Sequence, residues 1–195
     1  MFIRVLGSAA GGGFPQWNCN CKNCSSVRAG KEGYKERTQS SIAVSSNERD
    51  WLLFNASPDI LTQLKLAGVR LQPASNVRDS GIKSIVLMDA QIDHTTGLFM
   101  LRESSGPLVI YSTKEVKEEL TSGNPIFNVL DFYCKVDWVE IDVDAGCFVN
   151  IPRVKNIDLR FMPLKSEAPP FSPFRGKPRK GDNVGVQIMD TNTKK

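Results

Sequence analysis

The sequence has no apolar run long enough to form a membrane-spanning helix. The short apolar stretch at residues 1–6 is followed by Gly7 and a glycine run, which interrupts it before it could serve as a secretory signal. The sequence also lacks a basic stripe interleaved with aromatic residues, the pattern that nucleic-acid binding would favour. We therefore expect a cytoplasmic protein whose partners include neither a membrane nor a nucleic acid.

Histidine is scarce, since His94 is the only one in 195 residues. Cysteine is limited to five residues, an odd number with three clustered, which fits reduced thiols and metal binding better than a disulfide framework. The rest of the composition is that of an ordinary soluble protein, with 41% hydrophobic residues, 24% charged residues and a formal net charge of +4. The length suits one domain, which we place over residues 1–195.

Three of the five cysteines lie within six residues, as Cys19, Cys21 and Cys24. Cys19 and Cys21 project to the same side of an extended backbone, and a tight turn can return Cys24 to the same point. A structural zinc ion takes four ligands in a tetrahedron, and thiolates are among its usual ligands. The spacing predicts a zinc site with three local ligands and a fourth from elsewhere. Three unrelated thiols, or one disulfide with a spare thiol, would have the same spacing.

The hydrophobic pattern predicts an α/β domain in which helices cover a mixed sheet. The expected strands are residues 1–6, 40–45, 51–55, 82–88, 108–111, 138–141, 147–151, 159–164 and 184–189. The expected helices are residues 57–68, 96–103, 113–120 and 124–133. The stretch 169–181 has the composition of a long loop, which is either a lid over a cleft or simply a mobile segment.

A second group of metal-binding residue types follows the strand expected at residues 82–88. The sequence DAQIDH at 89–94 offers Asp89, Asp93 and His94, with Gln91 between them. Ligand sites in α/β domains tend to lie beyond the carboxyl ends of strands, and this segment is in that position. Carboxylate and imidazole ligands suit divalent iron, manganese or zinc. On these residues alone a helix start is an equal alternative, with Asp93 as the N-cap and His94 on the surface.

The same segment is similar to the metal-binding signature of the metallo-β-lactamase superfamily, His-x-His-x-Asp-His after a buried strand. Asp93 and His94 match this signature, whereas Asp89 and Gln91 stand where it has histidines. With three other motifs, the segment closely resembles the coenzyme PQQ synthesis protein B family over essentially the whole chain. The four motifs are LGSAAGGGFPQWNCNC at 6–21, NASPDI at 55–60, DAQIDHTTGL at 89–98 and DNVG at 182–185.

The resemblance implies an αββα sandwich of the metallo-β-lactamase type, of which these residues supply the N-terminal half to two thirds. It implies a role in the biosynthesis of pyrroloquinoline quinone (PQQ), through iron- and oxygen-dependent hydroxylation of the tyrosine ring of a Glu-Tyr-derived precursor. By resemblance, Cys19, Cys21 and Cys24 hold a structural zinc ion. Asp93 and His94 are then catalytic and, with Asp89, contribute to a site for iron. The partner is the small-molecule or dipeptide precursor, and a homodimer is one oligomeric state to expect.

Two other functions stay open at this point. One is a non-catalytic carrier that takes PQQ or its precursor towards the periplasm, and the other is a zinc-stabilised fragment with no function of its own. The loss of two signature histidines argues against the two-zinc hydrolysis common in the superfamily, because a bridging hydroxide needs both metals held. Members of the family continue beyond the position of Lys195, so we expect exposed sheet edges and apolar faces.

Overall fold

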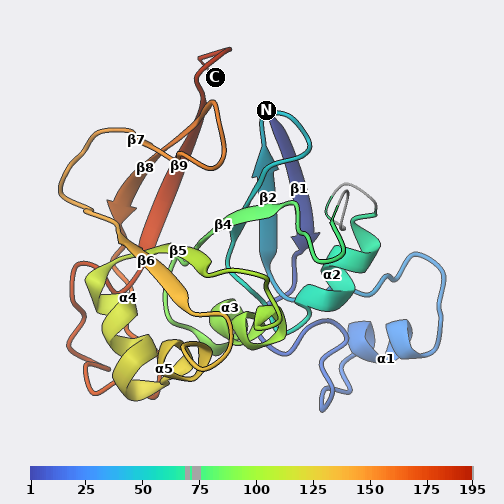
Figure 1. Ribbon diagram of the computed structural model, residues 1–195. Helices are drawn as coiled ribbons and strands as arrows, with labels where there is room; N and C mark the ends of the chain where they lie inside the picture. The colour runs from blue at the N-terminus through green and yellow to red at the C-terminus, as the bar shows by residue number, and fades with distance from the viewer. Residues whose placement is uncertain (69–70, 72–75, 195) are drawn as a thin grey trace.

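The computed structural model describes residues 1–68, 71 and 76–194, and its elements are arranged in three layers (Figure 1). A six-stranded sheet forms the middle layer. One apolar cluster joins a face of this sheet to the helices, and a second joins the other face to a three-stranded sheet. The described residues therefore form two main cores, one on each side of the larger sheet, as the predicted α/β class requires, and a third, smaller cluster lies around Ala43 and Trp51.

The larger sheet has the strand order β1-β2-β3-β4-β5-β6. Strands β1, β2 and β3 pair antiparallel with one another. From β3 through β6, neighbouring strands pair parallel. Leu52 and Phe54 of β3 face the smaller sheet, whereas Leu53 faces the helices. Burial on both faces explains why the central strands are continuous apolar runs. The bounds are β1 (Phe2–Gly7), β2 (Ser41–Ser45), β3 (Trp51–Phe54), β4 (Ile82–Val86), β5 (Leu108–Ser112) and β6 (Val136–Glu140).

The smaller sheet is antiparallel and consists of β7 (Val149–Asn150), β8 (Ile157–Pro163) and β9 (Val184–Asp190). Alternate residues of β8 and β9 point into the core, as period-two strands with one buried face should. Strand β9 is an edge strand of this sheet, and its first residue is tied to the larger sheet because Val184 N donates to Met88 O at 2.9 Å.

The helices agree with the prediction in place but less well in extent. They are α1 (Lys22–Arg28), α2 (Ile60–Leu66), α3 (Ile92–Thr95), the 3₁₀-helix η1 (Thr96–Leu101), α4 (Lys114–Glu118), the π-helix η2 (Glu119–Gly123) and α5 (Ile126–Leu130). Thr113 is the N-cap of α4, and its Oγ1 accepts a hydrogen bond from Val116 N at 3.2 Å. The helix expected at 96–103 begins four residues earlier, at Ile92.

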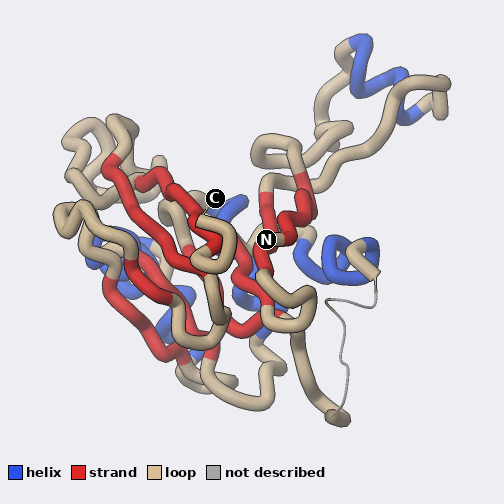
Figure 2. Tube along the Cα trace, turned by 90° about the horizontal axis from the view of Figure 1, so that it is seen from above, coloured by secondary structure: helices blue, strands red, loops and turns tan. Residues whose placement is uncertain are grey.

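Helix α1 was not predicted, because it has only a small apolar face. Its buried residues are Cys24, Ser26 and Val27. In the view of Figure 2, α1 and its flanking loops project from the body of the molecule. The projection carries the cysteine cluster, so that cluster lies outside both apolar cores.

The larger sheet is not fully covered on the side of the smaller sheet. On β1, Ile3 pairs with Val44 and Val5 pairs with Ile42, and both partners on β2 belong to the core on that side. Ile3 and Val5 themselves are 54% and 69% exposed. The three strands of the smaller sheet thus leave part of β1 exposed. No helix among the described residues has the length and apolarity that crossing a membrane requires.

Candidate metal centres

The three thiols of the predicted zinc site come together at the start of α1. Cys19 lies in the preceding loop, Cys21 is the N-cap residue, and Cys24 is in the first turn. An N-cap side chain lies near the residue three positions later, as in a capping box, so Cys21 and Cys24 approach each other. The three sulfur atoms lie within 4.8 Å of one another. A helix start, rather than the expected tight turn, gathers the cluster.

Two sets of contacts hold the loop that carries Cys19. The Arg28 guanidinium donates to Gln16 O at 3.2 Å and also to Cys19 O. Upstream, Phe14 and Arg37 exchange backbone hydrogen bonds of 2.8 and 2.9 Å, which tie the glycine-rich turn to the segment before β2. These contacts come from the loop itself, from α1 and from the segment before β2, and none of the residues named here belongs to the two main cores.

The thiols differ in their acidity. The pKa of Cys21 is lowered to about 7, first by a hydrogen bond from the Cys24 backbone amide and then by hydrogen bonds with the Cys19 and Cys24 thiols. A hydrogen bond from the Gln16 backbone lowers the pKa of Cys24, but burial and the Cys19 and Cys21 thiols together leave it raised. Since the thiolate is the form that binds metal, Cys21 is expected to ionise at a lower pH than Cys24.

The donor set fits a zinc ion at three of its four positions. With Zn–S bonds of about 2.3 Å, tetrahedral sulfur ligands lie roughly 3.8 Å apart, which is within the span of the cluster. Within residues 1–68, 71 and 76–194, no further Cys, His, Asp or Glu joins the three thiols as a fourth donor. Zinc binding by Cys19, Cys21 and Cys24 stays a prediction, with the fourth ligand still to be found.

The second candidate site lies just beyond the carboxyl end of β4. Helix α3 begins at Ile92 with Gln91 as its N-cap, so the alternative in which Asp93 caps a helix is wrong. The His94 imidazole lies between two carboxylates, with Nδ1 2.7 Å from Asp89 Oδ1 and Nε2 3.8 Å from Asp93 Oδ2. The backbone amide of Gln91 also donates to Asp89 Oδ1, at 2.9 Å. The structure thus brings Asp89, Asp93 and His94 together.

The two carboxylates change the acidity of the histidine. Burial lowers the pKa of His94, but the hydrogen bond to Asp89 and the charges of Asp89 and Asp93 leave it raised above its ordinary value. In the neutral ring, donation from Nδ1–H to Asp89 leaves the Nε2 lone pair on the side of Asp93. Asp89 therefore fixes the orientation of the ring, which is how carboxylates support metal-ligating histidines.

Residues near Asn55 fasten this site to the larger sheet. Asn55 Oδ1 accepts from Met88 N at 3.0 Å. Ala56 N donates to His94 O at 2.7 Å, and Gly97 N donates to Ala56 O at 2.9 Å. A Cβ at Gly97 would lie 2.1 Å from Ser57 O, so only glycine allows this approach. The second and third sequence motifs therefore form a single junction.

The glycine-rich turn closes another side of the site. A Cβ at Gly11 would lie 3.3 Å from the Asp93 carboxylate, so the backbone passes directly beside that group. Gln39 Oε1 accepts from Gly12 N at 3.0 Å, and Gln39 Nε2 donates to Asp59 Oδ2 at 3.1 Å. The first motif thus reaches the second through Gln39, a residue that the sequence did not single out.

The long loop before β9 is docked on α4 and η2 by ion pairs. Arg179 contacts Glu118 Oε2 at 2.5 Å, Glu119 Oε1 at 3.2 Å and Asp182 Oδ1 at 2.9 Å. The next residue, Asn183, forms an antiparallel bridge with Asp89. The DNVG motif therefore positions the start of β9 against the Asp–His site. Asn183 was missed as a site residue because only the fold places it beside Asp89.

A divalent metal fits the second site through two ligands. Asp93 Oδ2 and His94 Nε2 are separated by a distance that two ligands of one ion can span. Asp89 Oδ1 is engaged with Nδ1, on the side of the ring away from Nε2, and the role of Asp89 as a metal ligand stays a prediction. In the described part of the chain, the cysteines alone bring three potential ligand atoms within 4.8 Å of one another. The roles of Asp93 and His94 as metal ligands stay a prediction.

Comparison with known proteins identifies the class of this chain. The chain belongs to the β-lactamase superfamily, because the model of the family described as "Beta-lactamase superfamily domain" matches residues 50–195. The layers described above are the metallo-β-lactamase fold, which confirms the predicted fold class.

Within this class the chain is similar over nearly its whole length to coenzyme PQQ synthesis protein B, which confirms the resemblance found in the motifs. It is 54% identical over 191 residues to that protein of Azoarcus sp. (strain BH72), a match covering 98% of this chain and 62% of the relative. The match to that of Nitrosococcus oceani is 51% identical and covers 100% of this chain and 64% of the relative. The chain thus spans a little under two thirds of these relatives.

Solved structures agree with this assignment. The Zn²⁺-bound PqqB of Methylobacterium extorquens is 31% identical and superposes with a TM-score of 0.82, covering 97% of this chain and 62% of that one. A diphosphatase of the PhnP family, at 17% identity and a TM-score of 0.67, shares the fold. A zinc-bound relative and a three-thiol cluster together support metal binding by this chain.

Proposed function

We propose that this chain acts in PQQ biosynthesis, as part of a cytoplasmic, metal-dependent enzyme that hydroxylates the tyrosine ring of a precursor derived from Glu and Tyr. The similarity to coenzyme PQQ synthesis protein B supports the pathway. The observation that carries the choice of chemistry is the His94 imidazole held by Asp89 and facing Asp93.

The arrangement of the carboxylates favours this chemistry over two-metal hydrolysis. Asp89 occupies the position of the first signature histidine, but its Oδ1 is bonded to His94 Nδ1 and to Gln91 N. The side chain of Gln91 replaces the second histidine with an amide. One metal held by Asp93 and His94 then has open coordination positions, and carboxylate and imidazole donors suit ferrous iron. When bound, iron would supply redox chemistry with dioxygen.

The proposed reaction balances with a reductant. One oxygen atom of dioxygen replaces a ring hydrogen as a hydroxyl group, and the other leaves as water. Two electrons and two protons come from a two-electron reductant such as ascorbate. Residues of this chain hold the metal, orient the histidine through Asp89, and keep Asp93 in place beside Gly11. We propose that the precursor approaches from the open side of this cluster.

The test is an oxygen-uptake assay with the Glu-Tyr dipeptide, ferrous iron and ascorbate. It is run on this chain and on the full-length Azoarcus relative, because the chain spans only 62% of that protein. We expect iron-dependent oxygen consumption and a product heavier by one oxygen atom with the relative. His94→Ala, or the aligned change in the relative, should abolish both, whereas Asp137→Asn at an exposed site should change neither.

Two results would contradict the proposal. An intact relative that shows no ferrous-dependent hydroxylation would remove the oxygenase function. Tight binding of the quinone that needs no metal and survives His94→Ala would instead establish a carrier. An oxygenase in which only the full-length relative is active would show that the remaining third of the sequence is required.

A further inference from the structure

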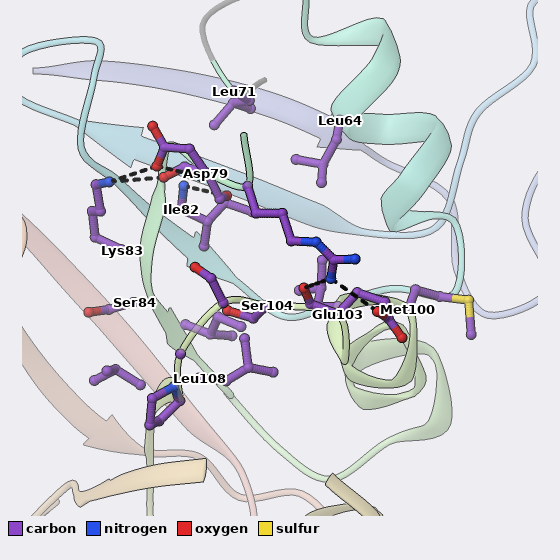
Figure 3. A pocket seen from close by; sticks show the side chains of 18 of the residues that line it. Leu64, Leu71, Asp79, Ile82, Lys83, Ser84, Met100, Glu103, Ser104 and Leu108 are labelled. Carbon is purple, nitrogen blue, oxygen red and sulfur yellow. Dashed lines mark hydrogen bonds and ion pairs between the residues drawn. The ribbon is translucent and has the colours of Figure 1, made fainter. Parts of the chain in front are cut away.

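A cavity of about 760 Å³ lies at the opposite end of the parallel strands from the Asp–His site. Its walls come from α2, the amino-terminal halves of β4 and β5, and the residues that end η1 and follow it. Figure 3 shows Leu64, Ile82, Met100 and Leu108 around this space, together with polar side chains. The volume is in the usual range for a site that binds a small molecule.

The cavity exists because two neighbouring strands are parted at their amino ends. The described pairing of β4 with β5 consists of Ile85 with Ile110 and Val86 with Tyr111. Earlier in β4, the register with β3 shifts between Ile82 and Ser84, and Leu108 of β5 pairs with β6. The two strands therefore form a wedge, which we call the β4–β5 wedge, instead of a continuous ladder.

One wall of the β4–β5 wedge contains a polar group without a partner. Ser84 is 1% exposed, and its Oγ makes no hydrogen bond with any described residue. A buried hydroxyl without a partner costs free energy, and such groups often mark an absent water or ligand. An oxygen atom of a bound molecule would supply the missing partner.

The charges around the wedge favour an anion. Four cationic side chains and two carboxylates line it, which leaves an excess of two positive charges. Arg78 pairs with Glu103 and Lys83 with Asp79, so both carboxylates are used. Lys65, on α2, and Arg153, in the segment before β8, have no carboxylate partner among the described residues. They approach the wedge from the two opposite layers of the fold.

We propose that the β4–β5 wedge binds a small amphipathic anion, an aliphatic or aromatic carboxylate. Its apolar body lies among Leu64, Ile85, Met100 and Leu108, and its carboxylate is held by Lys65 and Arg153. This site is separate from the proposed oxygenase centre, since β4 carries the two at opposite ends.

The experiment uses the zinc-loaded chain, with ¹³C in its methionine methyl groups and octanoate as the probe. Met100 lines the wedge and is 38% exposed, whereas Met162 is 43% exposed and lies outside it, so it is a matched internal control. The Met100→Leu variant assigns the reporter signal. We expect octanoate to shift the Met100 signal along a saturable curve and to leave that of Met162 in place.

Charge variants complete the test. The double variant Lys65→Glu with Arg153→Glu should weaken octanoate binding about fivefold or more, as expected for exposed charge pairs. The double variant Lys31→Glu with Lys35→Glu, an equal charge change at two exposed residues outside the wedge, should leave it unchanged. Octylammonium should not saturate the Met100 signal. Equal shifts of both methionines, equal binding of octylammonium, or an unchanged affinity of the double variant would each overturn the proposal.

Discussion

The cysteine cluster and the Asp–His site are built in opposite ways. The cysteine cluster takes all three of its groups from six consecutive residues at one helix start, outside the apolar cores. The Asp–His site needs the end of β4, the Asn55 junction, the glycine-rich turn and the start of β9. The first therefore depends on local conformation and the second on the whole fold.

Because of this difference, we expect the cysteine cluster to contribute to the stability of its own segment and the Asp–His site to carry the proposed chemistry. A local thiol cluster can bind zinc as soon as one helical turn forms, and its binding energy adds to the stability of that segment. The Asp–His site can bind metal in the correct geometry only after the sheets and helices have packed. Damage to the fold should thus remove the second site while the first still binds.

The largest expected effect is on the cysteine cluster. Cys24→Ser removes one of three thiolate ligands, so zinc affinity should fall by more than about 100-fold, beyond the roughly 10–100-fold cost of losing an outer hydrogen-bond partner. Competition with a chromophoric chelator measures it. Cys147→Ser, at an exposed thiol outside the cluster, is the control. Equal zinc affinity of the two variants would show that the cluster is not a metal site.

The second effect concerns Asp89 as the group that orients His94. Asp89→Asn keeps the size of the side chain but removes the carboxylate behind the imidazole, so iron affinity should fall about 10–100-fold. Zinc affinity of the cysteines should not change. Asp137→Asn makes the same chemical change at an exposed residue and should be neutral. A loss of zinc as well as iron would mean that the two sites are not independent.

A third prediction tests how far the Asp–His site depends on backbone packing. Gly97→Ala places a Cβ 2.1 Å from Ser57 O and should lower the free energy of unfolding by about 1–3 kcal/mol. Gly106→Ala, where a Cβ meets nothing within 4 Å, should stay within about 0.5 kcal/mol. Urea denaturation of both variants measures this. Equal midpoints would contradict the tight junction described at Ala56.

The smallest effect is on pH dependence. Because the folded pKa of metal-free His94 is raised, its protonation stabilises the fold below the unfolded pKa near 6.5. That contribution is lost as pH rises through the folded pKa. The single histidine gives one ring resonance in a proton NMR titration, and its midpoint should lie above 6.5 and fall in Asp89→Asn. An unchanged midpoint in the variant would show that the Asp89 carboxylate does not raise the pKa of His94.

The sequence predicted the local features of this chain best. The spacing of Cys19, Cys21 and Cys24 was sufficient to predict their convergence, although the helix that produces it has too few apolar residues to be recognised. The ends of the strands with buried side chains on both faces were predicted to within one or two residues.

Contacts between segments that are distant in the sequence could not be predicted from the residues alone. The 2.7 Å contact of Asp89 with His94 depends on where α3 begins, and that start was expected four residues later. Asn183 and Gln39 reach the site only because β9 and the segment before β2 pack against it. Asn183 lies in a motif that the family resemblance identified, whereas Gln39 lies in none of the motifs, and the physical role of both required the structure.

We propose that His94 belongs to an iron site that is separate from the cysteine cluster, for which we predict zinc. The most direct test of this proposal follows the His94 ring resonance while ferrous iron is added under anaerobic conditions to protein whose cysteines already hold zinc. We expect one equivalent of iron to broaden this resonance beyond detection and to release no zinc. An unchanged resonance, or iron that binds only by displacing zinc, would contradict it.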